Sequence, residues 1–140
     1  RASGEVFARH HQAVHALTDV TGYGLLGHLL EMLGESACDA EISVASVPLL
    51  PGARRLADAD VFPGGSRANL EAAASQTDTS AVSIADALLM ADAQTSGGLL
   101  AAVAPAHFDA LCRDLNMAGC RDVTQIGVIR TGNTRVRLVR

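Results

Sequence analysis

The chain has 140 residues, of which 49% are hydrophobic and 3% aromatic, so it is long enough for one domain with an aliphatic core. Its formal net charge of −4 argues against nucleic acid as a main partner, and no apolar run approaches the roughly 20 residues of a membrane-spanning helix. All 11 basic residues are arginines, which excludes a Walker-type phosphate loop, a Schiff-base lysine and a lysine general base within this sequence.

The cysteines indicate the redox compartment of the protein, and the first residues indicate whether the sequence belongs to a longer chain. Cys38, Cys112 and Cys120 are odd in number and show no Cys-x-x-Cys spacing, so we expect neither a disulfide framework nor a zinc site, and a reducing cytoplasm fits best. Residues 1–5 lack the apolar core of a signal peptide and look like a cut made inside a longer chain. We expect residues 1–12 to be a linker or a helix tail that arrives from a preceding part.

Three histidines lie near this beginning, at His10, His11 and His15. No carboxylate or cysteine accompanies the group, and His15 falls inside a predicted strand. We therefore interpret the three histidines as structural rather than as metal ligands.

A short apolar segment, residues 13–17, is bounded by polar residues and is typical of a buried strand. After it, leucines recur at helical spacing and predict a helix from near Gly22 to near Gly34. These leucines are Leu25, Leu26, Leu29 and Leu33. The sequence therefore predicts a strand, an acidic turn and a glycine-rich helix start.

The acidic turn at Asp19 indicates an anion site in one of two interpretations. It places a carboxylate and several unpaired backbone N–H groups at one edge of a sheet, where backbone donors and the helix dipole favour anions. Asp19 can hold a Mg²⁺ ion that escorts a phosphate. In the alternative interpretation, Asp19 and Thr21 only cap the helix, and the glycines only allow close packing.

The next segments predict a strand and a short helix. Residues 37–44 alternate polar and apolar side chains, which is typical of a half-buried strand. Residues 47–52 form a stiff apolar turn, and Pro51 is well placed near the start of a short helix through residues 54–56.

Residues 62–69 are expected to form a loop with a helix after it, and residues 76–80 a polar, flexible stretch. Gly64 and Gly65, together with Arg67 and Asn69, can wrap a ligand in this loop. The alternative is an ordinary solvated surface loop.

A second glycine-rich stretch lies between a predicted helix, residues 84–91, and a predicted buried strand, residues 99–103. The helix should turn four side chains inward, at Ile84, Ala87, Leu88 and Ala91. Gly97 and Gly98 open the strand, which is unusual because glycine weakens strands unless something packs tightly against it. Thr95 and Ser96 add hydroxyl groups at the same place.

The last third predicts a helix and a hairpin. Pro105 starts the helix and Gly119 stops it, while residues 123–130 read as a strand. A turn at Gly132 and Asn133 then leads into residues 134–139, an antiparallel partner with one solvated face and an arginine-guarded edge. Alternating helices and strands with this hairpin predict an α+β domain with a mixed sheet covered by helices.

Four segments together resemble the C-terminal domain of selenophosphate synthetase (selenide, water dikinase). They occur in the family's order and span nearly the whole chain. The segments are Thr18–His28, Val47–Ala53, Pro63–Asn69 and Asp92–Leu100. The departures are Tyr23 for the usual Phe, Ser66 for a common Thr and Ala93 for the usual Pro, which loosens a turn but removes no functional group.

The resemblance implies a member of the superfamily that also holds aminoimidazole ribonucleotide synthetase. The implied fold is α+β, a three-layer α/β/α arrangement with a mixed sheet that is partly ferredoxin-like. Residues 13–140 would be the C-terminal domain, and residues 1–12 the linker from an N-terminal ATP-binding domain. The full enzyme, expected as a cytoplasmic homodimer, converts ATP, selenide and water to selenophosphate, phosphate and AMP.

In this family the catalytic Cys or selenocysteine, the catalytic Lys and most Mg²⁺-binding aspartates belong to the N-terminal domain, so this chain alone is expected to be inactive. One aspartate carries over, because Asp19 matches the family's metal-binding Asp in the Thr-Asp-Val-Thr-Gly motif. The nucleotide-facing residues are expected in the two glycine-rich stretches. They are Thr21, Gly22, Gly24, Thr95, Ser96, Gly97 and Gly98.

Phosphoryl transfer depends on positioning and on charge neutralisation around the phosphates, to which a carboxylate on Mg²⁺ and backbone donors contribute. We therefore expect Asp19 and the turn of residues 21–24 to close one wall of a site for ATP and Mg²⁺. Two alternatives stay open. One is the same domain from a sister ATP-using enzyme, of the aminoimidazole ribonucleotide synthetase or hydrogenase-maturation type, and the other is a non-catalytic binding or assembly module.

Overall fold

The computed structural model describes residues 2–140, so the first residue of the predicted linker lies outside the described part. The helices are α1 (Ala2–Arg9), α2 (Gly24–Leu33), α3 (Ala53–Asp58), α4 (Gly64–Ala73), α5 (Ile84–Met90) and α6 (Phe108–Met117). The strands are β1 (Val14–Asp19), β2 (Cys38–Ser43), β3 (Thr77–Asp78), β4 (Leu99–Val103), β5 (Gly127–Thr131) and β6 (Val136–Val139). No helix in this part of the chain is long and apolar enough to cross a membrane.

The strands form two separate sheets. A four-stranded sheet has the order β3-β6-β2-β5, in which β2 pairs antiparallel with β5 and parallel with β6, and β3 pairs parallel with β6. β1 and β4 form an antiparallel two-stranded ribbon. The expected α+β class with a mixed sheet and helices is confirmed.

The main core lies between the four-stranded sheet and the helices α2, α4 and α5. Strands turn alternate residues to one face, so Ala40 and Ile42 of β2 face this core together with Val136 and Leu138 of β6. α2 adds its predicted apolar stripe, and Leu100 of β4 packs here as well. The buried leucines of α2 are Leu26, Leu29 and Leu33.

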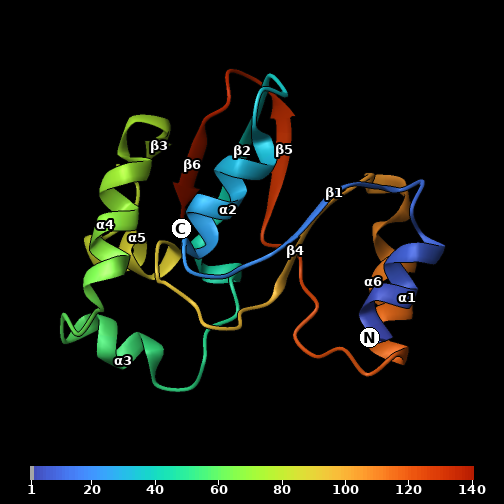
Figure 1. Cartoon of the computed structure of the whole chain (residues 1–140), viewed down its shortest axis with the longest axis horizontal. Coiled ribbons are helices and arrows are strands. Elements are labelled where there is room, and N and C mark those ends of the chain that lie inside the picture. Colours follow the sequence, from blue (N-terminus) through green and yellow to red (C-terminus); the bar gives the residue numbers. More distant parts are fainter. Residues whose placement is uncertain (1) are drawn as a thin grey trace.

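A second, smaller cluster joins α1 to α6 at the other end of the molecule, and the β1–β4 ribbon runs between the two parts (Figure 1). Its buried members are Val6, Phe7, Leu111 and Leu115. His10, directly after α1, hydrogen-bonds Asp114 of α6 through Nε2 at 2.9 Å, and this bond lowers the pKa of the Asp114 carboxyl. The interpretation of His10 as structural thus agrees with its contacts.

The predicted C-terminal hairpin is wrong. β5 and β6 lie on opposite sides of β2 instead of pairing with each other, so β6 is an interior strand rather than an edge. The reason is Asp39, whose carboxylate accepts hydrogen bonds from the backbone N–H groups of Asn133 (2.7 Å) and Arg135 (2.9 Å) and carries the connection across the end of β2. The solvated face of β6 is confirmed, because Arg137 is exposed while its neighbours are buried.

Other boundaries also differ from the predictions. Residues 13–17 are not a buried strand, because β1 alternates half-buried and exposed positions. α4 begins at Gly64, directly after Pro63, where a loop was expected. Residues 76–80 include β3, and residues 123–126 precede the strand β5. Ile84, predicted to point inward, is 69% exposed at the first turn of α5.

Candidate functional site

The two glycine-rich stretches predicted as sites lie against each other. Antiparallel pairing places Asp19, the last residue of β1, opposite Leu99, the first of β4. The segments that follow and precede these strands, residues 20–24 and 94–98, therefore leave the same end of the ribbon. We call them the two glycine loops.

Backbone hydrogen bonds join the two glycine loops. The N–H of Val20 donates to the carbonyl of Gly98 (2.9 Å), and the N–H of Gly97 donates to the carbonyl of Val20 (3.0 Å). Gln94 donates its N–H to the carbonyl of Thr21 (3.1 Å). These three N–H groups donate within the protein and are not free to bind an anion. The expectation of unpaired backbone donors is therefore wrong for Val20, Gln94 and Gly97.

Gly24 and Gly97 form the packed side of the loops. Gly24 has a φ of +68°, and a Cβ there would lie 2.6 Å from the carbonyl carbon and oxygen of Ala91. A Cβ at Gly97 would lie 2.5 Å from the carbonyl oxygen of Val20. Real Cβ atoms do not approach backbone this closely, so close packing alone requires glycine at both positions.

Gly22 and Gly98 form the open side, with Thr95 and Ser96 beside Gly98. All four residues are exposed, and a Cβ at either glycine would have no heavy atom within 4 Å. Neither glycine shows the left-handed backbone that disfavours other residues. The fold itself therefore gives no reason for glycine at these two positions.

Side chains of α4 hold both glycine loops in place. The Asn69 side-chain amide donates to the carbonyls of Gly22 (2.8 Å) and Ala91 (3.1 Å), so it bridges one glycine loop and the segment that enters the other. The hydroxyl of Ser66, which is fully buried, donates to the Asp92 carboxylate at 2.5 Å and accepts from the N–H of Ala93. The third sequence segment thus positions the loops.

The Asn69 amide is consequently engaged within the fold, and Arg67 forms an ion pair with Asp60 at 2.7 Å. The roles of Ser66 and Asn69 were missed at the level of sequence. Their spacing of three residues, which places both on one helix face, is the signal that was available once the helix was known to include them.

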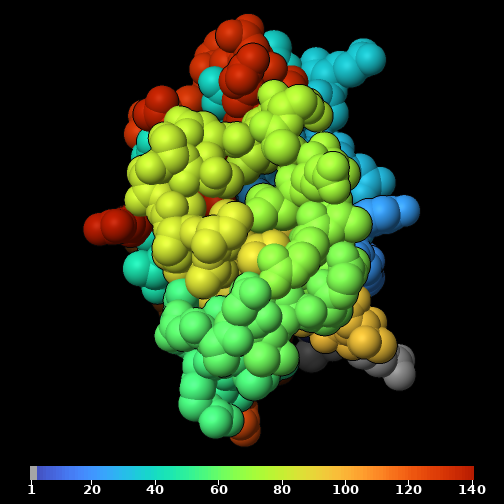
Figure 2. Space-filling model, turned by 90° about the vertical axis from the view of Figure 1, so that its left-hand side faces the viewer, coloured from blue at the N-terminus to red at the C-terminus, as the bar shows by residue number. Residues whose placement is uncertain are grey.

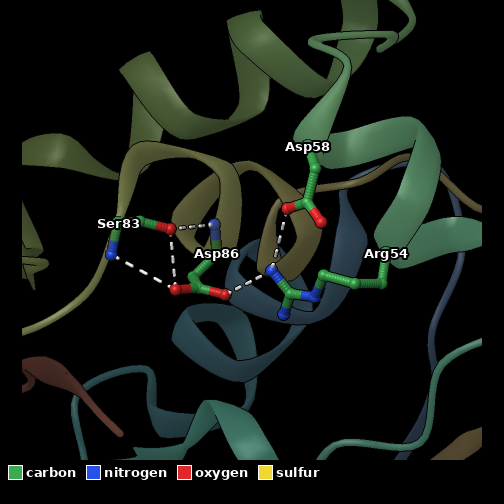
Figure 3. A network of polar contacts seen from close by, with 4 residues as sticks. All are labelled: Arg54, Asp58, Ser83 and Asp86. Carbon is green, nitrogen blue, oxygen red and sulfur yellow. Dashed lines mark hydrogen bonds and ion pairs between the residues drawn. The ribbon is translucent and has the colours of Figure 1, made fainter.

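The helix α3, which follows the second segment (Val47–Ala53), supports α5, the helix that leads into the second glycine loop. Arg54 of α3 forms an ion pair with Asp86 of α5 at 2.6 Å and lies 3.9 Å from Asp58 (Figure 3). The Asp86 carboxylate also closes a capping box with Ser83 at the start of α5. Partial burial raises the pKa of Asp86, but the hydrogen bonds from Ser83 and Arg54 outweigh it and hold that pKa below its usual range. Figure 2 shows α3, α4 and α5 side by side on this face of the molecule.

The Thr21 side chain contacts the middle of α2. Its hydroxyl hydrogen-bonds Nε2 of the buried His28 at 2.9 Å, and the ring of Tyr23 meets the His28 ring edge-on at 5.7 Å. The residue that caps α2 is Tyr23, and it makes no side-chain capping bond. The alternative in which Asp19 and Thr21 serve as helix caps is therefore wrong.

Asp19 is exposed at the end of β1, on the rim of the open side. Residues 2–140 contain no group of three or more His, Cys, Asp or Glu side chains that could hold a metal ion. Mg²⁺ in phosphate sites is commonly held by one or two carboxylates together with phosphate oxygens and water. A single accessible carboxylate such as Asp19 can therefore supply one ligand to Mg²⁺ but cannot form a complete metal site.

Comparison with known proteins shows the family to which the chain belongs. The family described as AIR synthase related protein, C-terminal domain, matches residues 4–139. A selenide, water dikinase of Myxococcus xanthus is 40% identical over 145 residues, which cover 99% of this chain and 40% of that protein. A selenide, water dikinase of Paraburkholderia xenovorans is 40% identical over 127 residues, covering 90% of this chain and 36% of that protein.

The chain therefore spans about 40% of the length of the first of these relatives. Among solved structures, thiamine-monophosphate kinase from Stenotrophomonas maltophilia aligns with a TM-score of 0.60 and 22% identity, covering 93% of this chain and 33% of that one. At this identity the likeness shows a shared fold.

Proposed function

Because the chain belongs to the AIR synthase related proteins, whose C-terminal domain it forms, we propose that it is the C-terminal domain of a selenide, water dikinase. The relatives of that name match 99% and 90% of it at 40% identity. The observation that carries the proposal is the meeting of the two glycine loops beside Asp19. Their open side offers accessible glycines and hydroxyl groups for which the fold has no use of its own.

The proposed reaction converts ATP, selenide and water to selenophosphate, phosphate and AMP. ATP and Mg²⁺ would be held mainly by the part of the protein that lies outside this sequence, and Asp19 would supply one oxygen ligand. Bound Mg²⁺ neutralises negative charge on the phosphates as they are transferred. Gly22 and Gly98 let the backbone approach a phosphate, and the hydroxyls of Thr95 and Ser96 donate to its oxygens.

The other predicted nucleotide-facing residues act indirectly in this proposal. Gly24 and Gly97 let the loops touch, and Thr21 orients the start of α2 through His28. The chain alone would be inactive, since one carboxylate and two loops form only one wall of a site. We also propose that the full-length enzyme acts in the cytoplasm as a homodimer, in keeping with the cysteine pattern and the family resemblance.

The test is an Asp19→Asn variant of the full-length protein, with Asp109→Asn as the matched control. Asp109 is also exposed but lies on α6, away from the loops. We expect Asp19→Asn to lose most ATP turnover and to need more Mg²⁺, while its free energy of unfolding stays unchanged. Full activity of Asp19→Asn in steady-state assays across a Mg²⁺ titration would remove the metal role.

A further inference from the structure

His28 carries the one polar side chain among the buried residues of α2. It is 8% exposed, and the cost of burying a polar side chain is offset only where hydrogen bonds satisfy it. In the imidazole ring, Nε2 lies 2.9 Å from the Thr21 hydroxyl oxygen, whereas Nδ1 has no hydrogen-bond partner among residues 2–140. A leucine would fill this space without an unsatisfied polar atom. Packing alone therefore does not explain why the residue is a histidine.

Thr21, the partner of His28, belongs to a peptide unit whose carbonyl is held by the fold. This carbonyl accepts the N–H of Gln94 in the second glycine loop (3.1 Å) and the N–H of Gly24 at the start of α2 (3.0 Å). The peptide bonds of the described chain are trans, so the N–H of Gly22 points away from the Thr21 carbonyl and its two donors. Gly22 is exposed, and its N–H donates no hydrogen bond within residues 2–140. The Thr21–Gly22 peptide therefore presents a free donor on the open side of the loops.

A further hold on Thr21 comes from His28 through the Thr21 side chain. The imidazole lies in the middle of α2, a helix whose buried leucines are anchored in the main core. The ring of Tyr23 packs edge-on against it, with the two centroids 5.7 Å apart. His28 is thus fixed by its surroundings, whereas Thr21 lies in a loop. The contact that orients α2 consequently acts in the other direction as well, because the helix holds the loop.

We propose that His28 is a positioning residue, which fixes the Thr21–Gly22 peptide so that the N–H of Gly22 meets a phosphate oxygen of ATP. This inference rests on the proposed function and deepens it, since it names a backbone donor on the open side and the residue that aims it. A donor that is already oriented in the free protein needs no ordering when the phosphate binds. In this proposal His28 does not touch the nucleotide and acts through Thr21.

The test is the affinity of the full-length protein for a non-hydrolysable ATP analogue with Mg²⁺, measured by isothermal titration calorimetry. His28→Leu removes the hydrogen bond and keeps an apolar volume, and Thr21→Val removes the same bond from the other side. We expect each variant to bind about fivefold more weakly, and the double variant no more weakly than either, because all three lack one and the same contact. The midpoint of urea unfolding should not fall in His28→Leu, because the unsatisfied Nδ1 is removed with the ring.

Two further variants separate this hydrogen bond from the other properties of the histidine. His28→Gln places an amide near the position of Nε2, so it should bind the analogue within about twofold of the parent protein. Glu31→Gln is the matched control, because the Glu31 carboxylate lies 3.4 Å from the other ring nitrogen, Nδ1, and is 73% exposed. It should leave the affinity unchanged.

Parental affinity in His28→Leu, or an equal loss in Glu31→Gln, would overturn the proposal. So would a loss in His28→Leu that accompanies a lower urea midpoint and that His28→Gln does not restore, because the histidine would then be structural. The readout does not depend on turnover. Weaker binding by His28→Leu and Thr21→Val, in a protein whose ATP use is indifferent to selenide, would support the role of His28 and reject the proposed reaction. Parental affinity in His28→Leu, in a protein that makes AMP only with selenide, would reject the positioning role alone.

Discussion

The packed side and the open side of the two glycine loops contain the same residue type for different reasons. At Gly24 and Gly97 the neighbouring backbone leaves no room for a Cβ, so the fold alone explains the glycine. At Gly22 and Gly98 the space around the Cβ position is empty. The comparison teaches that one motif can hold two kinds of constraint, and that only the second kind points to a ligand.

The largest expected effect is on the packed side. Gly24→Ala should lower the free energy of unfolding by about 3 kcal/mol, because the new Cβ meets the Ala91 carbonyl in a left-handed backbone. Gly22→Ala, in the same loop, should change it by no more than about 0.5 kcal/mol. Urea unfolding followed by circular dichroism measures both. Equal changes in the two variants would remove the distinction between the sides.

The next effect concerns the hydrogen bonds from α4. Ser66→Ala leaves the Asp92 carboxylate and the Ala93 N–H without their buried partner and should cost about 2 kcal/mol. Ser75→Ala is the matched control, since Ser75 is exposed near the end of the same helical segment. If Ser66→Ala and Ser75→Ala unfold at the same urea concentration, Ser66 does not hold the second loop.

Substitutions on the open side should lower the activity and leave the free energy of unfolding unchanged. In the full-length protein, Gly98→Ala should reduce kcat/KM for ATP about tenfold, or about 1.4 kcal/mol of transition-state stabilisation, without changing the unfolding transition. Gly4→Ala, at an equally open glycine in α1, should leave kcat/KM unchanged and raise the free energy of unfolding by up to about 1 kcal/mol, because alanine is the better helix former. If Gly98→Ala retains full activity, the open side has no part in handling the nucleotide.

The smallest expected effect is a pH dependence of the free energy of unfolding. It comes from Asp86 of α5 and not from the glycine loops. Because the pKa of Asp86 is lowered in the folded protein, its contribution is complete above the unfolded pKa of about 3.9 and is lost as the pH falls through the folded pKa. Asp86→Asn should therefore cost about 1 kcal/mol at pH 7, and the difference should shrink below pH 4.

Asp58→Asn is the control for this pair, because Asp58 lies 3.9 Å from the same Arg54 and is 63% exposed. It should change stability little at any pH. A stability difference between Asp86→Asn and the parent that persists unchanged at pH 3 would show that the Asp86 charge does not stabilise α5. Thermal unfolding between pH 3 and pH 7 gives both curves.

Local patterns in the sequence were sufficient for several elements. The leucine spacing of α2 and the alternation in β2 are set by neighbours a few residues away, and both elements appear within one or two residues of their predicted bounds. The strand order was not accessible in this way. It depends on Asp39 holding the backbone at Asn133 and Arg135, more than 90 residues away.

The candidate site shows the same division. The glycines, hydroxyl groups and acidic turn of residues 18–28 and 92–100 predict a role beyond packing, but the sequence does not distinguish the packed side of the loops from the open side. Only the tertiary contacts reveal that Gly24 touches Ala91 while Gly98 faces solvent. Asn69 reaches the carbonyl of Gly22 across 47 positions of sequence, a bond that no local pattern encodes.

The central claim is most directly tested by AMP formation in the full-length protein. With ATP and Mg²⁺ present, AMP and phosphate are quantified with and without added selenide, and selenophosphate is identified by phosphorus NMR. The account predicts AMP that requires selenide and the appearance of selenophosphate. Consumption of ATP that is indifferent to selenide would contradict the proposed reaction and assign the domain to another ATP-using enzyme of the same fold.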